Sequence, residues 1–275
     1  MARTGRARST SSANFSEVAR DNTARVINTV KADIACIVEA EDRLTLKAFD
    51  TDLLKSRFKY EMLIDGNDMR GIDVGIYSRF PLGAVWTHMF DKRGTTAIFS
   101  RDCPEYEVLL PNGKSLFLLC NHLKSKGYDT SGTANARRKH QAEAIAKILE
   151  KYDLKRDLVI VAGDLNDTPA SDPLSPLLGV QNLFDVLDVE FGAQPGKRWT
   201  YHYKGVYDQI DYMLVSRPLK NALTKTGIER RGIHDLKRLT ESSNGAVTVE
   251  TQFDTVGHWT DAASDHAALW ADFTL

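Results

Sequence analysis

The segment from Val159 to Pro169, VIVAGDLNDTP, constrains the fold of this chain more than any other stretch. Its opening residues form a continuous apolar run with several β-branched side chains, which is typical of a strand buried on both faces. The run breaks at Gly163, and a carboxylate and a carboxamide follow at Asp164 and Asn166. In open α/β sheets, ligands bind beyond the C-terminal ends of the strands. A capped turn is the competing interpretation, because Asp and Asn favour turns in any protein.

Polar side chains recur at the ends of other apolar runs, which favours a shared site over an isolated turn. At least four further runs end in, follow or carry acids, amides or histidines: 34–38 before Glu39, 115–120 before Asn121 and His122, 210–216 with Asp211, and 267–273 after Ser264-Asp265-His266.

The alternation of apolar strands and amphipathic helices predicts an α/β fold with mixed sheets. Asn112-Gly113 between two apolar runs predicts a β-hairpin. Residues 1–15 are polar and basic and are predicted to be disordered, and residues 16–275 are predicted to form one domain. We expect helices at 16–31, 43–55, 135–152 and 173–178, and strands at 33–38, 60–64, 72–77, 84–90, 106–110, 115–120, 159–162, 182–188, 198–203, 209–216 and 267–273.

Composition sets limits on the function. The 275 residues are 42% hydrophobic, enough for one sizeable core, and the net charge is −1, so any polyanion site must be a local patch. Cys36, Cys103 and Cys120 lack metal-ligand spacing, which argues mildly for a reducing compartment. No apolar stretch approaches the roughly 20 residues that span a bilayer. We expect a cytoplasmic protein, or a secreted one if an N-terminal segment is missing.

The acidic residues suit a hard divalent cation. Carboxylate oxygens from Glu39, Asp164 and Asp265 are the ligands that Mg²⁺ or Mn²⁺ prefers. His266 directly follows a candidate ligand and is better placed as a base, with Asp211 fixing its tautomer.

Two further side chains complete the predicted chemistry. Asn166 can orient a water or a phosphate oxygen, and His122 can donate to a non-bridging oxygen or leaving group. Together with the metal, the acids and the base, these groups predict a metal-assisted phosphoester hydrolase.

The first turn of the helix expected at 135–152 carries four basic or titratable residues, Arg137, Arg138, Lys139 and His140. Cations at a helix N-terminus oppose the macrodipole. A solvated charged face is the ordinary interpretation, and the alternative is that one arginine meets a phosphate.

In order along the chain, these motifs resemble the endonuclease/exonuclease/phosphatase superfamily, which includes proteins similar to deoxyribonuclease I and the AP endonucleases. The residues that carry the resemblance are Glu39, 121–125 (NHLKS), 163–166 (GDLN), 210–212 (IDY) and 264–266 (SDH). The stretch 67–74 (NDMRGIDV) further resembles bacterial members, which are often extracellular nucleases. The likeness covers about Ser16 to Leu275.

The resemblance implies a four-layer α/β sandwich of two packed mixed sheets flanked by helices. It implies Glu39 and Asp265 at the metal and His266 with Asp211 as the base dyad. Asp164 and Asn166 would position the nucleophile and phosphate, and His122 would stabilise the transition state. It also implies substrate contacts at Asn121, Lys124, Arg70 and Arg138. For Lys124 and Lys126 a solvated side chain is the ordinary interpretation, and contact with substrate is the alternative.

One departure from the family pattern concerns the start of the chain. Members usually begin with a strand that carries a metal-side asparagine, but no apolar run precedes Ser16, and Asn14 lies in a polar segment. We therefore hypothesise an N-terminally shortened chain in which the strand at 33–38 is left as an exposed edge.

The leading functional hypothesis is a Mg²⁺- or Mn²⁺-dependent nuclease that acts on DNA or RNA as a monomer without membrane contact. A phosphatase or phosphodiesterase for small or lipid phosphoesters would use the same groups. A non-catalytic binding module of the same fold is the third possibility.

Overall fold

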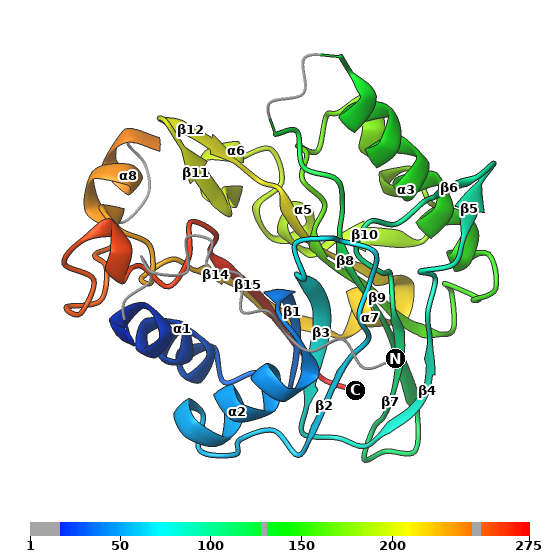
Figure 1. The fold of residues 1–275 in the computed structure, drawn as a ribbon, viewed down its shortest axis with the longest axis horizontal. Helices are drawn as coiled ribbons and strands as arrows, with labels where there is room; N and C mark the ends of the chain where they lie inside the picture. The colour runs from blue at the N-terminus through cyan, green and yellow to red at the C-terminus, as the bar shows by residue number, and fades with distance from the viewer. Residues whose placement is uncertain (1–16, 128–130, 244–248) are drawn as a thin grey trace.

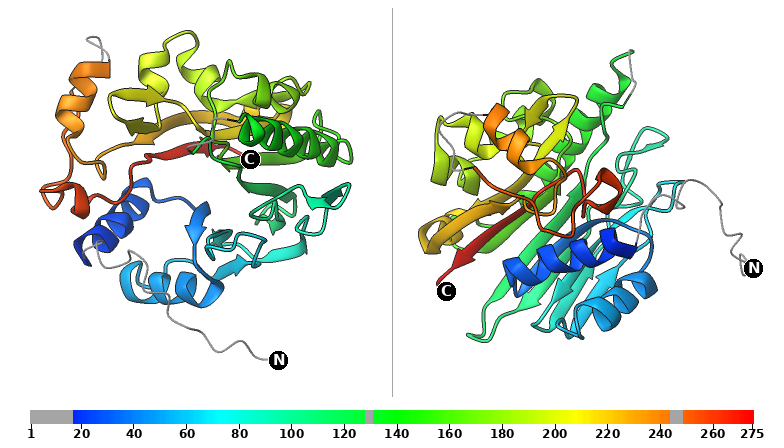
Figure 2. Two further views of the ribbon diagram at one scale, coloured as in Figure 1. Left: turned by 45° about the horizontal axis from the view of Figure 1, so that its top comes forward. Right: turned by 90° about the vertical axis from the view of Figure 1, so that its left-hand side faces the viewer.

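The computed structural model describes residues 17–127, 131–243 and 249–275. The expected disorder of residues 1–15 lies outside the described residues. Figure 1 shows helices on both outer surfaces and strands between them, and Figure 2 shows the layers from two further directions.

A six-stranded mixed sheet forms one inner layer, in the order β10-β13-β9-β8-β7-β4. Only β8 and β9 pair in parallel, and the other neighbours are antiparallel. The parallel pair is joined by α3 (Thr133–Leu149), since parallel strands need a long crossover. The strands are β4 (Leu82–Trp86), β7 (Glu105–Leu109), β8 (Ser115–His122), β9 (Leu158–Asp164), β10 (Leu183–Asp185) and β13 (Asp211–Ser216).

The other inner layer consists of two smaller antiparallel sheets. One has the order β1-β3-β2, and the other pairs β14 with β15. Sequence analysis anticipated a single sheet here, so the division into three strands and two strands is a finding of the structure. The strands are β1 (Ile34–Ala40), β2 (Tyr60–Leu63), β3 (Asp73–Ser78), β14 (Leu223–Glu229) and β15 (Ala268–Phe273).

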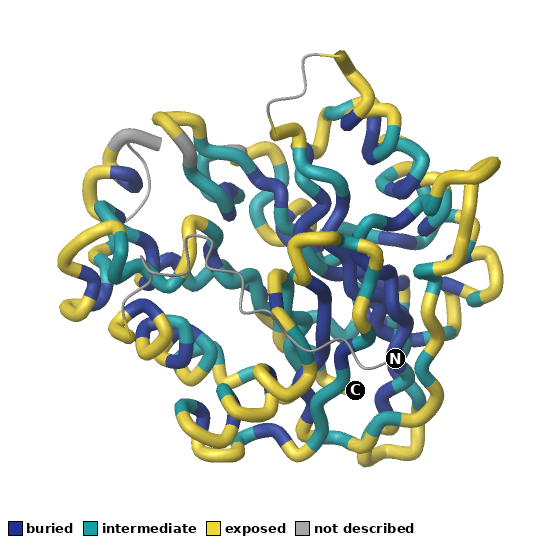
Figure 3. The backbone as a smooth tube through the Cα atoms, in the orientation of Figure 1, coloured by how far each residue is buried: buried dark blue, intermediate teal, exposed yellow. Residues whose placement is uncertain are grey.

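Apolar residues on both faces of β9 explain why this strand lies at the centre of the molecule. Val159 and Val161 pack on the α3 side with Ile145, whereas Ile160 packs against β3 on the opposite side. Figure 3 shows the buried stretches gathered in these central strands. A further cluster holds α1 (Glu17–Val30) and α2 (Arg43–Leu53) on the outer face of the three-stranded sheet. The four-layer α/β sandwich is therefore confirmed.

Shorter elements surround these layers. The described residues add β5 (Lys92–Arg93), β6 (Thr96–Ala97), β11 (Tyr201–Tyr203), β12 (Val206–Asp208), α4 (Ser175–Leu178), α5 (Val186–Phe191), α6 (Pro195–Arg198), α7 (Arg217–Ala222), α8 (Leu236–Ser243) and the 3₁₀ turns Asp172–Leu174 and Trp259–Asp261. Among all the described helices, none combines the length and apolar character that crossing a bilayer requires.

Candidate active site

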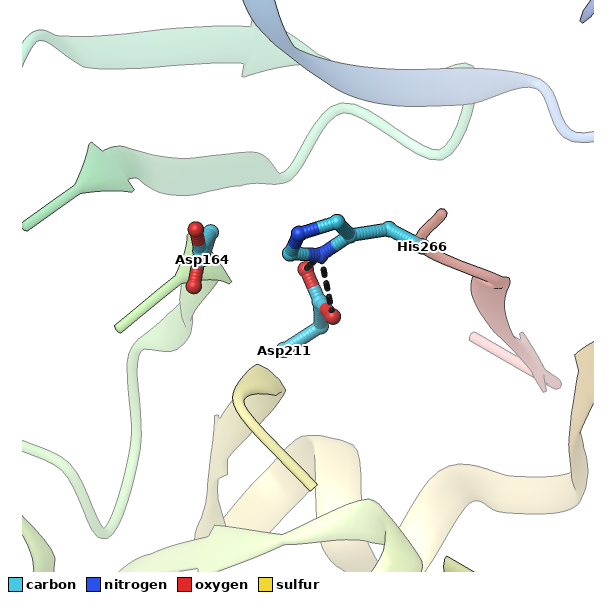
Figure 4. Close-up of side chains that lie close together, drawn as sticks. All are labelled: Asp164, Asp211 and His266. Carbon is cyan, nitrogen blue, oxygen red and sulfur yellow. Dashed lines mark hydrogen bonds and ion pairs between the residues drawn. The ribbon is translucent and has the colours of Figure 1, made fainter. Parts of the chain in front are cut away.

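Three neighbouring strands bring three of the predicted site residues to one end of the six-stranded sheet. His122 of β8 lies opposite Asp164 of β9, and Asp211 of β13 lies opposite Asp164 on the other side. His266 comes from the other inner layer, directly ahead of β15, and its ring lies over the two aspartates (Figure 4). Residues far apart in the sequence therefore meet at one point between the layers.

Gly163 makes the junction between β8 and β9 possible. Its φ is +126°, and a Cβ atom at this position would overlap the carbonyl oxygen of Asn121 on the neighbouring strand. Only glycine accommodates both this backbone conformation and this close approach. The glycine thereby sets the position of Asp164, the next residue.

His266 and Asp211 form an oriented acid–imidazole pair. The His266 Nδ1 atom lies 2.9 Å from Asp211 Oδ2 and 3.2 Å from Oδ1. Burial disfavours the imidazolium, but the charge and hydrogen bond of Asp211, with smaller contributions from Asp164 and Asp265, raise the pKa of His266 to about 10. The predicted dyad thus has the geometry that fixes a histidine tautomer, with Nε2 left for the reacting partner.

Asp164 is a buried carboxyl group held by its own turn. Its Oδ1 accepts from the Asn166 backbone N–H at 2.8 Å, and its Oδ2 accepts from Asn166 Nδ2 at 2.7 Å. Burial, followed by the charge of Asp211, raises the pKa of Asp164 to about 8. The turn interpretation of Asp164 and Asn166 is therefore correct locally, and the same turn builds the site.

His122 is a neutral, buried imidazole beside these acids. Its Nε2 lies 3.5 Å from Asp164 Oδ2 and 4.0 Å from Glu39 Oε1. Burial, then the positive charges of Arg101 and His266, lower the pKa of His122 to about 3. A neutral imidazole at this position can donate one hydrogen bond to a substrate oxygen.

The candidate metal ligands are distributed around this cluster. Asp164, Asp211 and His266 each place a ligand atom within 4.8 Å of the others. Glu39 has a φ of +59°, and its side chain is 60% exposed and reaches His122. Asp265 is exposed, and its negative charge contributes to the raised pKa of His266. The structure thus brings Glu39 to the rim and leaves Asp265 outside the tight group.

The predicted substrate residues divide into exposed and buried groups. Arg70 is exposed and paired with Asp68, at 3.0 Å between Arg70 Nη2 and Asp68 Oδ2. Asn121 is fully buried, with its Oδ1 unpartnered, and its Nδ2 donates to the Leu119 carbonyl. Lys124 uses its backbone, donating to Gln141 Oε1 at 2.8 Å.

Arg138 has a different environment from the one expected. Its guanidinium is fully buried and donates to Asp167 at 2.7 and 2.9 Å and to the Lys124 carbonyl at 2.6 Å. In place of a phosphate contact, Arg138 ties α3 to the loop after β9. The solvated-face interpretation also fails for this residue, since an internal carboxylate compensates its charge.

Sequence reasoning missed one cation near the site. Arg101 is buried, lies 2.9 Å from Asp68 through Nε, and donates to the Leu123 carbonyl at 3.2 Å. Lys126, which the sequence left as a solvated or substrate-contacting side chain, is exposed and lies 2.8 Å from Asp167. An isolated arginine in a loop carries no periodic signal, so only the tertiary contacts could have identified Arg101.

The fold and the site together define an α/β sandwich enzyme with an acid–histidine centre at the sheet ends. A sequence model of the endonuclease/exonuclease/phosphatase family matches residues 9–266, so this chain belongs to that family. The sequence resemblance is thereby confirmed. No match was found among curated proteins.

Solved structures share the fold at low sequence identity. Humanized TDP2 of D. rerio is 17% identical, covers 93% of both chains and has a TM-score of 0.62. D. rerio TDP2 complexed with a single-strand DNA product is 18% identical, with 92% of each chain covered and a TM-score of 0.61. A beta toxin structure from Staphylococcus aureus is 18% identical, covers 93% of this chain and 92% of that chain, and has a TM-score of 0.62.

Proposed function

We propose that this protein is a divalent-metal-dependent phosphodiester hydrolase whose substrate is nucleic acid. The observation that carries the proposal is the Asp211–His266 pair facing the buried Asp164 at the strand ends. Family membership supports the reaction class, and a similar fold with a single-strand DNA product supports the substrate.

The residues at the site fit a hard cation. Two carboxylates and an imidazole converge, and the raised pKa of Asp164 shows that its negative charge is poorly compensated by the protein alone. We propose that Asp164 and Glu39 hold Mg²⁺ or Mn²⁺, with Asp265 nearby. Such an ion, when bound, would act as a Lewis acid on a phosphoryl oxygen.

The side chains of this protein would accept the proton of the attacking water, donate a hydrogen bond to the phosphate and bind its neighbours. Asp211 holds His266 through Nδ1, so that Nε2 can accept a proton from the attacking water once the imidazole is neutral. His122, which is neutral, donates to a non-bridging oxygen, and Asn166 holds Asp164 in place. Arg70 and Lys126, both exposed, are the proposed contacts to neighbouring phosphates.

A substrate panel tests this proposal. Plasmid DNA, single-stranded DNA, RNA and a phosphomonoester are incubated with the protein in Mg²⁺, Mn²⁺ or EDTA, beside Glu39→Gln as a variant expected to need more metal. We expect metal-dependent cleavage of nucleic acid that EDTA abolishes. Full activity in EDTA, or turnover of the phosphomonoester alone, would contradict the proposal.

A further inference from the structure

The two members of the acid–imidazole pair belong to different layers of the molecule. Asp211 is the first residue of β13 in the six-stranded sheet, and His266 lies two residues ahead of β15 in the other inner layer. Their side chains are nevertheless held at 2.9 Å between His266 Nδ1 and Asp211 Oδ2. A shift of one layer against the other by about 1 Å would disturb this contact. A residue bonded to both segments would prevent such a shift.

Thr200 bonds to the main chain of both segments. Its Oγ1 atom accepts hydrogen bonds from the N–H groups of Ile210 at 3.2 Å and Asp211 at 3.1 Å. Its carbonyl oxygen accepts from the N–H group of Ala267 at 2.7 Å. Thr200 is therefore attached to Asp211 itself and to the residue that directly follows His266.

The threonine side chain suits this position for a chemical reason. A hydroxyl oxygen has two lone pairs, so it can accept from both N–H groups at the start of β13. Thr200 is fully buried, and loss of its hydroxyl would leave the donors of Ile210 and Asp211 without this partner, which is costly away from water. Because Thr200 has no exposed surface, direct contact with a substrate is excluded as its role.

The next residue along the chain contacts the histidine. Tyr201 forms an antiparallel β-bridge with His266, and the centroids of their two rings are 4.7 Å apart with 48° between the ring planes. The tyrosine ring therefore limits the rotation of the imidazole, while Asp211 holds its Nδ1 atom.

The segment that carries Thr200 is itself anchored. The carbonyl oxygen of Trp199 accepts two hydrogen bonds from the buried guanidinium of Arg230, at 3.2 Å from Nε and 3.0 Å from Nη2. The same guanidinium lies 4.4 Å from the centroid of the Trp199 ring. Trp199 and Ala267 also belong to one buried hydrophobic cluster. The anchored segment can therefore serve as a fixed reference for Asp211 and His266.

We propose that Thr200 is a positioning residue for the Asp211–His266 pair, because it holds the start of β13 and the residues ahead of β15 at a fixed separation. The inference rests on the proposed function, in which His266 is the base. Thr200 takes no part in proton transfer itself. Its loss should therefore slow the chemical step rather than weaken the binding of substrate.

Three variants test the role of the hydroxyl. Thr200→Val removes the acceptor but keeps the branched shape, and Thr200→Ser keeps the hydroxyl. Thr226→Val is the matched control, because Thr226 is also buried and its hydroxyl donates to the Trp270 carbonyl of β15 at 2.6 Å. Each protein is assayed on single-stranded DNA with Mg²⁺. The low-field proton NMR signal of the His266 Nδ1–H group is recorded without substrate, and its absence in His266→Ala assigns it.

We expect Thr200→Val to lower kcat by about tenfold or more with KM little changed, because a small misplacement of a catalytic group slows the chemical step. The low-field signal should shift or disappear. Thr200→Ser should restore both, and Thr226→Val should lower the thermal midpoint without changing either. A normal kcat and signal in Thr200→Val, equal losses of kcat in the two valine variants, or a failure of Thr200→Ser to restore activity would overturn the proposal.

The NMR signal separates this proposal from the proposed function. A changed signal in Thr200→Val, together with an original chain that cleaves no nucleic acid, would contradict the proposed function while supporting the link between Thr200 and the pair. If Thr200→Val does not fold, hydrogen exchange in the original chain decides. The amides of Ile210, Asp211 and Ala267 should then be similarly protected, since all three donate to Thr200. Rapid exchange of any one of them would overturn the proposal.

Discussion

At the scale of single residues, the active site depends on compensating charges in a buried place. His266 is stabilised in its charged form by Asp211, whereas His122, two strands along the sheet from Asp211, is neutral because burial and Arg101 oppose its charge. The pKa values of two histidines in one site are therefore displaced in opposite directions, so that only His266 can exchange a proton near neutral or alkaline pH, whereas His122 stays a neutral hydrogen-bond donor.

Removal of the proposed base tests this assignment. His266→Ala should lower kcat by about 10²-fold or more, the usual scale for loss of a general base. Asp211→Asn should also be severe, because an amide favours the wrong imidazole tautomer. His234→Ala is the matched control, since its ion pair with Asp235 is a loose contact of 3.8 Å. Near-normal rates in both site variants would place the base elsewhere.

The same pair predicts how the stability of the metal-free protein depends on pH. The pKa of His266 is raised from 6.5 to about 10, so its pairing stabilises the fold fully below about pH 6.5 and is lost as the pH rises through 10. The raised pKa of Asp164, about 8, acts in the same direction between pH 3.8 and 8. Thermal midpoints measured in EDTA should therefore fall between about pH 6.5 and 10. A similar fall in Asp211→Asn would show that the pairing of His266 with Asp211 does not cause it.

At the scale of elements, the site depends on contacts between strands and between α3 and the loop after β9. The β8–β9 ladder fixes His122 against Asp164, and the Arg138–Asp167 pair anchors the helix that connects the two strands. These elements were predicted from the sequence, but their points of attachment were not.

Gly163→Ala tests the close approach of β8 and β9. The φ of +126° and the overlap with the Asn121 carbonyl should together destabilise the protein by at least about 2 kcal/mol. Gly113→Ala is the control, because it also has a positive φ, +80°, but nothing lies within 4 Å of its added Cβ. Urea unfolding of both variants measures the difference, and equal losses would show that the approach is unimportant.

Arg138→Met separates the structural role of this residue from a role in substrate binding. Loss of the buried partner of Asp167 should destabilise the protein by about 3 kcal/mol. Lys139→Met, which removes an exposed pair with Asp172 at 2.9 Å, should cost less than about 1 kcal/mol. If Arg138→Met kept full stability but bound nucleic acid more weakly, the result would support the phosphate contact expected from the sequence and contradict the structural role.

At the scale of the whole molecule, positive and negative charges are nearly equal in number. The net charge of −1 gives no general attraction for a polyanion, so the proposed function requires Arg70 and Lys126 to attract it near the site. Each phosphate contact contributes roughly one unit to the slope of log affinity against log salt. Arg70→Ala and Lys126→Ala should therefore each lower that slope by about one. Arg156→Ala is the control, because this arginine is 86% exposed and lies beside Asp153. An unchanged slope in Arg70→Ala and Lys126→Ala would mean that these two residues do not contact the phosphates of the nucleic acid.

The sequence alone determined the central strands, the helix between β8 and β9 and the predicted chemistry, because these are written in local patterns. The strand expected at 182–188 gives way to helix α5 from Val186 on, and β14 was not expected. The β-branched run at 159–162, the Asn112-Gly113 turn and the helix after Gly132 follow from residue type and period, and the Asp211–His266 pair follows from ordered motifs. Only the tertiary structure decided the burial of Arg138 and Arg101 and the division of the second inner layer into two separate sheets. Those features arise from packing between distant segments, and neither the partner of a lone charged side chain nor the neighbour of a strand is marked in the local sequence.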